Sequence, residues 1–346
     1  MLRTSVLALG ALVSGCATRT VERASAAGAA LRSKLPNANR PLPPLPADPA
    51  AGIDGLPRLI TPTPEFFRID TANDVPAVNA RAWTLRIDGM VARPLELDYQ
   101  SLLERDIIEV DAALACVSNE VGGFLVGNAR WRGVRLAELV ADAAPLARAD
   151  QVLGHSTDGF TAGFPVSALW DRDAILALGM NGEVLTAEHG YPARIIVPGL
   201  YGYVSAVKWV TRIELTRFDQ QVGYWVPRGW SQFAPVKLAS RIDTPRNGSA
   251  VPTGPTAIGG VAWAGMSGIQ QVQVQIDDGP WRDAELGPQL SSTSWRQWWL
   301  PWDVTPGKHT LTVRARDDEG NVQSARQVPP DPNGAEGLHT ISINAE

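Results

Sequence analysis

Cys116 is the residue whose chemistry stands out in this sequence, because the chain of 346 residues has only 2 cysteines. It follows the apolar run 113–115 and leads into a polar, glycine-rich stretch that ends at Gly123. A lone thiol in such a place can be a reactive or metal-binding sulfur. It can equally be a small buried hydrophobe. Position alone leaves both interpretations open.

Composition excludes other kinds of site. The net charge is -5 and no cluster of Lys and Arg is present, so phosphate-backbone binding to a nucleic acid is not expected. Only 4 histidines occur, and none has the paired spacing of a zinc site. With 45% hydrophobic and 19% charged residues, the length predicts about two folded domains.

The N-terminus has the layout of a targeting segment. Residues 1–16 contain Arg3, an apolar stretch over 6–13 and small residues before Cys16, which is typical of an export signal with a lipidated cysteine. The alternative is part of a transmembrane anchor, because the apolar stretch is too short to span a bilayer alone. Both alternatives predict an extracytoplasmic, membrane-associated protein. Residues 17–55 are rich in Ala and Pro and predict a stiff spacer.

Two domains are expected after the spacer. Residues 56–232 mix strand patterns, as in 83–87 and 193–197, with a helical pattern over 134–146, which predicts an α+β domain. Residues 233–346 show strand runs separated by turn signals, which predicts an all-β, immunoglobulin-like sandwich. The strand runs are 257–263, 272–276, 295–302, 310–315 and 339–343.

Three further runs follow Cys116 in a fixed order. They are Gly127–Val134, then Met180–Gly182 leading to His189-Gly-Tyr-Pro-Ala-Arg194, then Val197–Trp209 with its Pro-Gly turn and Lys-Trp ending. In this order after a lone cysteine, they resemble the sulfite oxidase family of molybdopterin-dependent oxidoreductases. The likeness runs from about Thr61 to the C-terminus. Within the family, the chain resembles the membrane-associated bacterial branch.

The resemblance implies a fold, a cofactor and a set of residues. It implies Mo-molybdopterin, with Cys116 as the thiolate ligand of the metal, since a soft sulfur suits molybdenum. An anionic cofactor also needs buried cations and hydrogen-bond donors. The β-rich second half then corresponds to the family's dimerisation domain, so a homodimer is expected. The residues that the resemblance assigns to cofactor binding are Phe67, Asp70, Cys116, Asn119, Asp158, His189, Arg194, Ser205, Ala206, Val207 and Lys208.

Each assignment has a simpler structural explanation. His189 can cap a turn, and Arg194 can be a surface charge at the start of a strand. Lys208 beside Trp209 can be a cation on an aromatic face. The joint order and spacing of the runs favour the cofactor site. Of the 12 tryptophans, four crowd into 295–302, which predicts that some of them meet another domain or subunit.

Departures from the family concern the substrate. Glu120 follows Asn119 where sulfite oxidases proper have an arginine, and a carboxylate there would repel sulfite. Arg68 is present but displaced by one position. The family's active-site tyrosine is replaced by Trp230, with Tyr224 and Arg228 near enough in sequence to substitute. Trp230, Tyr224 and Arg228 therefore join Cys116 as candidate catalytic residues.

The sequence predicts oxygen-atom transfer at a cysteine-ligated molybdenum centre, on a small oxo-compound of sulfur. The chain has no Cys-x-x-Cys-His haem motif, so electrons would pass to a separate carrier, a cytochrome or a quinone-linked system. One alternative is a sulfoxide or N-oxide reductase on the same cofactor. Another is a non-catalytic, lipid-anchored, immunoglobulin-like binding protein.

Overall fold

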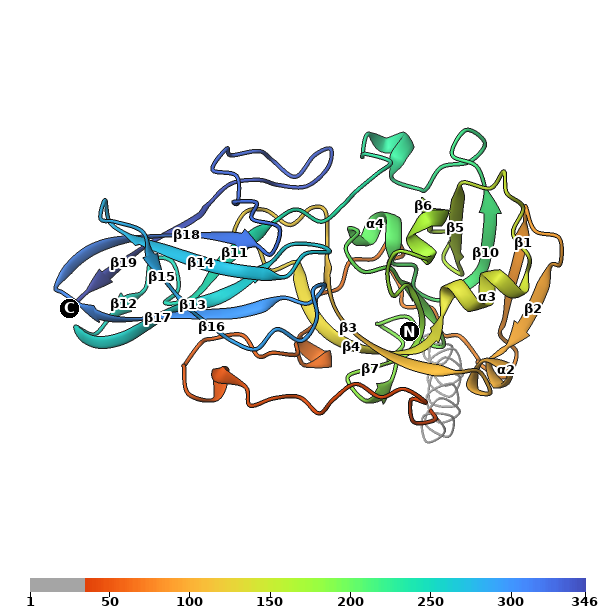
Figure 1. The fold of residues 1–346 in the computed structure, drawn as a ribbon, viewed down its shortest axis with the longest axis horizontal. Coiled ribbons are helices and arrows are strands. Elements are labelled where there is room, and N and C mark those ends of the chain that lie inside the picture. The colour runs from red at the N-terminus through yellow and green to blue at the C-terminus, as the bar shows by residue number, and fades with distance from the viewer. Residues whose placement is uncertain (1–34) are drawn as a thin grey trace, which may run out of the picture.

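The structure is a computed structural model, and it describes residues 35–346. In this part of the chain β-strands dominate, and helices are few and short (Figure 1). The expected α+β class is therefore corrected to a mostly β protein with few helices. The helices are α2 (Tyr99–Leu103), α3 (Leu136–Asp142) and α4 (Gly202–Ser205), with single 3-10 turns η1 (Pro49–Ala51), η2 (Thr63–Glu65), η3 (Val166–Leu169) and η4 (Val226–Arg228).

The helix expected over 134–146 is shorter than its pattern suggested. Strand β4 (Val126–Arg135) continues through Val134, which pairs with Ile107 on one side and Leu176 on the other. Helix α3 starts only after that strand and buries the predicted apolar face. It ends where Ala144 takes a left-handed backbone conformation with φ of 53°, which a helix cannot continue through.

The first domain contains two sheets. One has the strand order β3-β4-β7-β8 with β9 paired to β7, and the other has the order β2-β1-β10-β5-β6. The remaining strand bounds are β1 (Thr84–Gly89), β2 (Leu95–Asp98), β3 (Ile107–Ala115), β5 (Gln151–Ser156), β6 (Thr161–Pro165), β7 (Ile175–Met180), β8 (Glu183–Val184), β9 (Arg194–Ile196) and β10 (Val210–Thr216). Side chains of both sheets form one apolar core that includes Trp131, Ile87 and Val207.

The second domain is all β and also contains two sheets, which lie beyond β3 and β4 in Figure 1. Their strand orders are β11-β13-β17-β16 and β12-β19-β18-β14-β15. Side chains of both sheets share a second core around Trp298. The immunoglobulin-like type of this domain stays a prediction. The strands are β11 (Ala239–Thr244), β12 (Ala250–Val251), β13 (Gly254–Trp263), β14 (Ile269–Ile276), β15 (Arg282–Asp283), β16 (Glu285–Leu286), β17 (Arg296–Val304), β18 (Gly307–Asp317) and β19 (His339–Ala345).

A third apolar cluster joins the two domains. It packs Ala115, Val117 and Tyr203 of the first domain against Val261 and Trp295 of the second. The chain around Cys116 therefore borders this contact between the domains.

The four tryptophans of residues 295–302, at and within strand β17, pack inside the chain. Trp295 is 3% exposed and donates from Nε1 to the carbonyl oxygen of Leu59 at 3.0 Å. Trp298 and Trp302 are buried in the core of the second domain, and Trp299 is half-buried. Crowding in this segment therefore does not by itself require a second subunit.

The described part of the predicted spacer, residues 35–55, packs on the folded body. Asn39 exchanges hydrogen bonds with Ile107 at the start of β3, and the carboxylate of Asp48 accepts from Gln297 of β17 at 2.8 Å. Figure 1 shows this segment running along both domains. For residues 35–55 the predicted stiff spacer is therefore corrected to a segment that packs on the folded body, because Asn39 and Asp48 are hydrogen-bonded to strands of the two domains.

The predicted signal or anchor over 1–16, with Cys16, lies outside the described residues. Within residues 35–346, no helix has the length and apolar character needed to cross a bilayer.

Candidate active site

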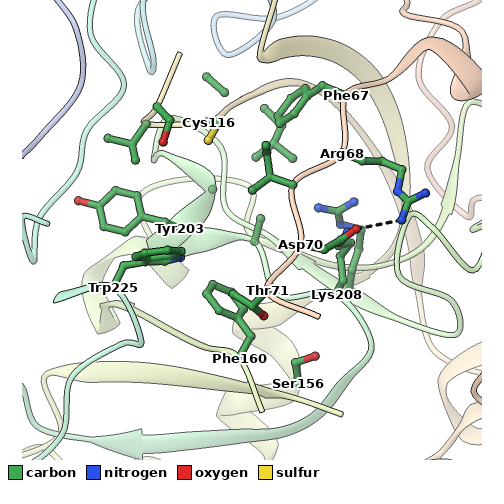
Figure 2. Close-up of a pocket in the computed structure, with 18 of the residues that line it drawn as sticks. Phe67, Arg68, Asp70, Thr71, Cys116, Ser156, Phe160, Tyr203, Lys208 and Trp225 are labelled. Atoms are coloured by element: carbon green, nitrogen blue, oxygen red, sulfur yellow. Dashed lines mark hydrogen bonds and ion pairs between the residues drawn. The ribbon is translucent and has the colours of Figure 1, made fainter. Parts of the chain in front are cut away.

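A cavity of about 150 Å³ opens in the first domain beside the contact with the second (Figure 2). Five segments far apart in sequence meet there: 67–71, 114–118, 156–160, 189–209 and 225–230. Its lining residues are Phe67, Arg68, Ile69, Asp70, Thr71, Leu114, Ala115, Cys116, Val117, Ser118, Ser156, Asp158, Phe160, His189, Arg194, Gly202, Tyr203, Ala206, Lys208, Trp209, Trp225 and Trp230.

Cys116 is the first residue after strand β3, and its half-buried side chain lines the cavity. Its backbone N–H donates to Leu125 at 2.9 Å, and its carbonyl oxygen accepts from Asn119 at 3.1 Å, so the loop that follows folds back on it. Burial raises the pKa of the Cys116 thiol, and hydrogen bonds from Ser118 partly oppose the rise. A metal ion that binds this sulfur would displace the proton.

Cationic side chains gather across the cavity from Cys116, as Figure 2 shows for Arg68 and Lys208. Both contact the carboxylate of Asp70, Arg68 at 2.9 Å. Burial, with the charge of Arg68 nearby, lowers the pKa of Lys208 to about 7. An anion placed here would favour the charged form of Lys208 and offset that burial.

Arg194, the first residue of β9, is 4% exposed and has an incomplete set of partners. Its Nη1 donates to the carbonyl oxygen of His189 at 3.1 Å, and its guanidinium lies 5.1 Å from the ring centroid of Trp131. Its buried Nε has no hydrogen-bond partner among the described residues. Burial lowers the pKa of Arg194 to about 9. A buried guanidinium with a free donor suits an anionic ligand.

His189 is held in one orientation. Its Nε2 lies 2.9 Å from the carbonyl oxygen of Thr63, and its ring meets Phe66 edge to face. Burial first, and then the charge of Arg194, lowers the pKa of His189, so the ring is neutral near pH 7. Because a carbonyl oxygen only accepts, Nε2 carries the hydrogen and Nδ1 is left as an acceptor.

Three further residues of the predicted cofactor-binding set also line the cavity. Asp158 accepts from the hydroxyl of Thr71 at 3.1 Å and from the backbone N–H of Phe160 at 3.0 Å, so it fixes the turn between β5 and β6. Phe67 stacks on Phe66 with centroids 5.4 Å apart. Ala206 is a third lining residue, just after helix α4.

The Cys116 side of the cavity is aromatic. Tyr203 of α4 packs against Trp230 with ring centroids 5.8 Å apart, and Trp225 lies on the same side (Figure 2). The hydroxyl of Tyr203 donates to the carbonyl oxygen of Ser231 at 2.5 Å. Burial raises the pKa of Tyr203 to about 12, so this phenol is neutral.

Several expected site residues lie outside the cavity wall. Asn119 closes its own loop by accepting from Leu125 at 2.7 Å. Ser205 is fully buried and donates to the carbonyl oxygens of Leu200 and Tyr201, each at 3.0 Å. Val207 belongs to the apolar core. The side chains of these three residues do not line the cavity.

Tyr224 and Arg228 form a pair away from the wall. The Arg228 guanidinium lies 3.6 Å from the ring centroid of Tyr224, and Arg228 is exposed. Of the three candidates that follow the Lys-Trp ending, only Trp230 lines the cavity, and Trp225 and Tyr203 line it as well. Neither of these two was predicted, although Tyr203 lies inside the quoted Val197–Trp209 run.

Glu120 does not face the cavity. Its side chain is exposed, and it borders a separate, small hollow beside Tyr201 and Glu336. The expected repulsion of sulfite by Glu120 is therefore wrong for this cavity, because the loop after Cys116 turns that side chain away.

Comparison with known proteins agrees with this geometry. Residues 72–225 match a family model described as the oxidoreductase molybdopterin binding domain. Mitochondrial sulfite oxidase of Homo sapiens is 29% identical over 322 residues, which cover 78% of this chain and 58% of that protein. An uncharacterized oxidoreductase of Bacillus subtilis is 30% identical over 165 residues, which cover 47% of this chain and 80% of the relative.

Among solved structures, the sulfane dehydrogenase SoxCD from Paracoccus pantotrophus is similar over 83% of each chain, with a TM-score of 0.71 and 26% identity. The fold is therefore that of a molybdopterin-binding oxidoreductase. The chain belongs to the sulfite oxidase family. It spans 58% of the length of the first curated relatives that it matches.

The residues present fit such a cofactor. The thiol of Cys116 offers a soft ligand for molybdenum on one side of the cavity. On the other side, the unpartnered Nε of buried Arg194 and the ammonium of Lys208 suit the cofactor's anionic groups. Among residues 35–346, no three His, Cys, Asp or Glu side chains gather as a metal site of their own. The remaining ligands would come from the cofactor itself.

Proposed function

We propose that this protein is a molybdopterin-dependent oxidoreductase that transfers an oxygen atom to or from the sulfur of a small compound. One observation carries the proposal: a single cavity contains the Cys116 thiol and, across from it, a cationic group formed by buried Arg194 and half-buried Lys208. Bound molybdenum supplies two-electron redox chemistry, and the protein binds and orients the cofactor.

The roles of the side chains follow from their contacts. Cys116 would bind the metal as a thiolate, and Arg194 and Lys208 would hold the anionic part of the cofactor. Neutral His189 would accept a hydrogen bond at Nδ1, since its Nε2 is occupied by Thr63. Asp70 contacts both Arg68 and Lys208 and would hold these two side chains in place until the cofactor binds.

The direction of turnover defines two candidate reactions. Oxidation of sulfite would take one oxygen from water and release two electrons and two protons. Reduction of a sulfoxide or N-oxide would consume two electrons and two protons and release water. In either direction, a separate carrier protein or a quinone-linked system would exchange the electrons one at a time. The aromatic wall next to Cys116 favours the second reaction.

Location and assembly are part of the proposal. The predicted signal or anchor over 1–16 supports an extracytoplasmic protein at a membrane, in the membrane-associated bacterial branch of the family. The likeness to the family supports a homodimer formed by the second domain, for which we propose an immunoglobulin-like sandwich. Sedimentation that shows only monomers would refute the dimer.

Metal analysis tests the central claim. Protein made in a host that synthesises molybdopterin should contain stoichiometric molybdenum by mass spectrometry. Cys116→Ser should lose firmly bound molybdenum while keeping the circular dichroism spectrum of the parent. Thr312→Ser, on the far sheet of the second domain, is the matched control and should keep the metal. Absence of molybdenum from the parent protein refutes the proposed function.

A further inference from the structure

The charges of the cavity are separated from Cys116. Arg68 and Lys208 lie across the cavity and share the carboxylate of Asp70 (Figure 2). Arg194 is buried, and its Nη1 donates a hydrogen bond to the carbonyl oxygen of His189. These cations fit the cofactor's anionic part, and their positions leave the Cys116 side without them.

The groups next to Cys116 are aromatic and uncharged. Tyr203 and Trp225 lie on its side of the cavity, and Trp230 packs on Tyr203. The phenol of Tyr203 is neutral and already donates to Ser231. Ala115 and Val117 complete this side. A small dianion placed here would be buried without a countercharge, which is costly.

One further apolar side chain of the cavity wall reaches the solvent. Ile69 lines the cavity and is 52% exposed, so an apolar side chain remains in contact with water. The indole nitrogens of Trp225 and Trp230, two residues that line the cavity, each carry an N–H group. They are neutral donors that suit an uncharged oxygen. Aromatic rings also make favourable contacts with divalent sulfur.

We propose that Tyr203, Trp225 and Trp230 form a subsite for an uncharged organosulfur compound, a sulfoxide or the thioether related to it, and that this subsite selects against sulfite. The inference rests on the proposed function and narrows it to a substrate class. Selection acts through the missing countercharge and through the apolar surface that the organic groups of such a compound would cover.

Direct binding to the cofactor-loaded protein tests the subsite. Methyl phenyl sulfoxide and sulfite are titrated separately by calorimetry, with quenching of tryptophan fluorescence as a second readout. We expect the sulfoxide to bind at least roughly tenfold more tightly than sulfite. Sulfite binding as tightly as the sulfoxide, or more tightly, overturns the inference.

Variants of Trp225 separate the contribution of its aromatic ring to binding from the effect of a positive charge at the same position. Trp225→Ala should weaken sulfoxide binding roughly tenfold, and Trp225→Phe should keep most of it. Trp225→Arg should strengthen sulfite binding by supplying the missing countercharge. Trp170→Ala removes a tryptophan that is 57% exposed and lies outside the cavity, so it should change neither affinity. Unchanged sulfoxide binding in Trp225→Ala, Trp225→Phe and Trp225→Arg also overturns the inference.

Molybdenum content distinguishes failure of the proposed subsite from failure of the proposed function. Metal-loaded protein that prefers sulfite refutes the subsite and leaves the oxidoreductase intact. Protein that binds the sulfoxide through Trp225 but carries no molybdenum refutes the proposed function and supports the subsite. With reduced viologen as the electron donor, loaded protein should also consume the sulfoxide faster than it oxidises sulfite with a one-electron acceptor.

Discussion

Arg241 of strand β11 donates from Nη1 to the carbonyl oxygen of Gly123 at 2.8 Å, which ties the second domain to the loop that follows Cys116. The guanidinium also lies 5.0 Å from the ring centroid of Phe124 and 2.8 Å from the carboxylate of Asp243. His339 of β19 covers the same loop at Gly122, where a Cβ would stand 2.2 Å from its ring. The second domain thus sets the shape of the loop that follows Cys116.

Replacing Arg241 by Met should destabilise the protein strongly. The change leaves the carboxylate of Asp243 buried without its partner, and loss of one member of a buried pair costs about 3 to 5 kcal/mol. Chemical denaturation followed by fluorescence measures this change. The double variant with Asp243→Asn should recover part of the loss. Arg217→Met, which breaks an exposed pair with Asp219, should have little effect.

Stability should fall in acid through His339. Burial first, and then the charge of Arg241, lowers the pKa of His339 to about 4 from an ordinary value of 6.5. The unfolded chain therefore binds this proton first, so the contribution of His339 is complete above pH 6.5 and is lost as pH falls toward 4. Protonation would also end the hydrogen bond that Nδ1 accepts from the backbone N–H of Ile242 at 3.0 Å.

The test for His339 compares denaturation midpoints of the parent and of His339→Gln at pH 7 and at pH 4.5. The parent should lose more stability than the variant over this interval. An equal loss in both proteins would show that His339 does not titrate in this window.

Arg194→Met should separate cofactor binding from folding. Removing a buried guanidinium with an unpartnered Nε relieves a desolvation cost, so the cofactor-free protein should be at least as stable as the parent. Cofactor retention should fall roughly tenfold or more, because a hydrogen bond to a charged group is lost. Molybdenum per chain and the free energy of unfolding measure the two effects. Full retention of the metal would contradict the assigned role.

Trp295→Phe tests how the N-terminal segment is held. The indole Nε1 of Trp295 donates to the carbonyl oxygen of Leu59, which also accepts from the side chain of Asn128 at 2.8 Å. Since that oxygen keeps one partner, the variant should lose only about 1 kcal/mol. Adding Asn128→Ala should cost more than the sum of the single changes, and simple additivity in denaturation would argue against a shared acceptor.

Local patterns in the sequence predicted the strands well. The alternation over 83–87 corresponds to β1, and the runs of the second domain correspond to β13, β14, β17, β18 and β19. The helix over 134–146 was predicted too long because Val134 is still part of strand β4. Its strand pairing is with Ile107 and Leu176, which are far away in sequence. Burial pattern alone does not distinguish a strand end from a helix start there.

The sequence by itself determined that Cys116 follows a strand and precedes a tight loop, and that His189, Arg194 and Lys208 follow in family order. These are properties of neighbouring residues. Only the tertiary structure decided which side chains share the cavity: it placed Trp225 and Tyr203 beside the thiol and turned Glu120 away. The physical reason is that the cavity is made by packing five segments that are spread between residues 67 and 230, which no local pattern encodes.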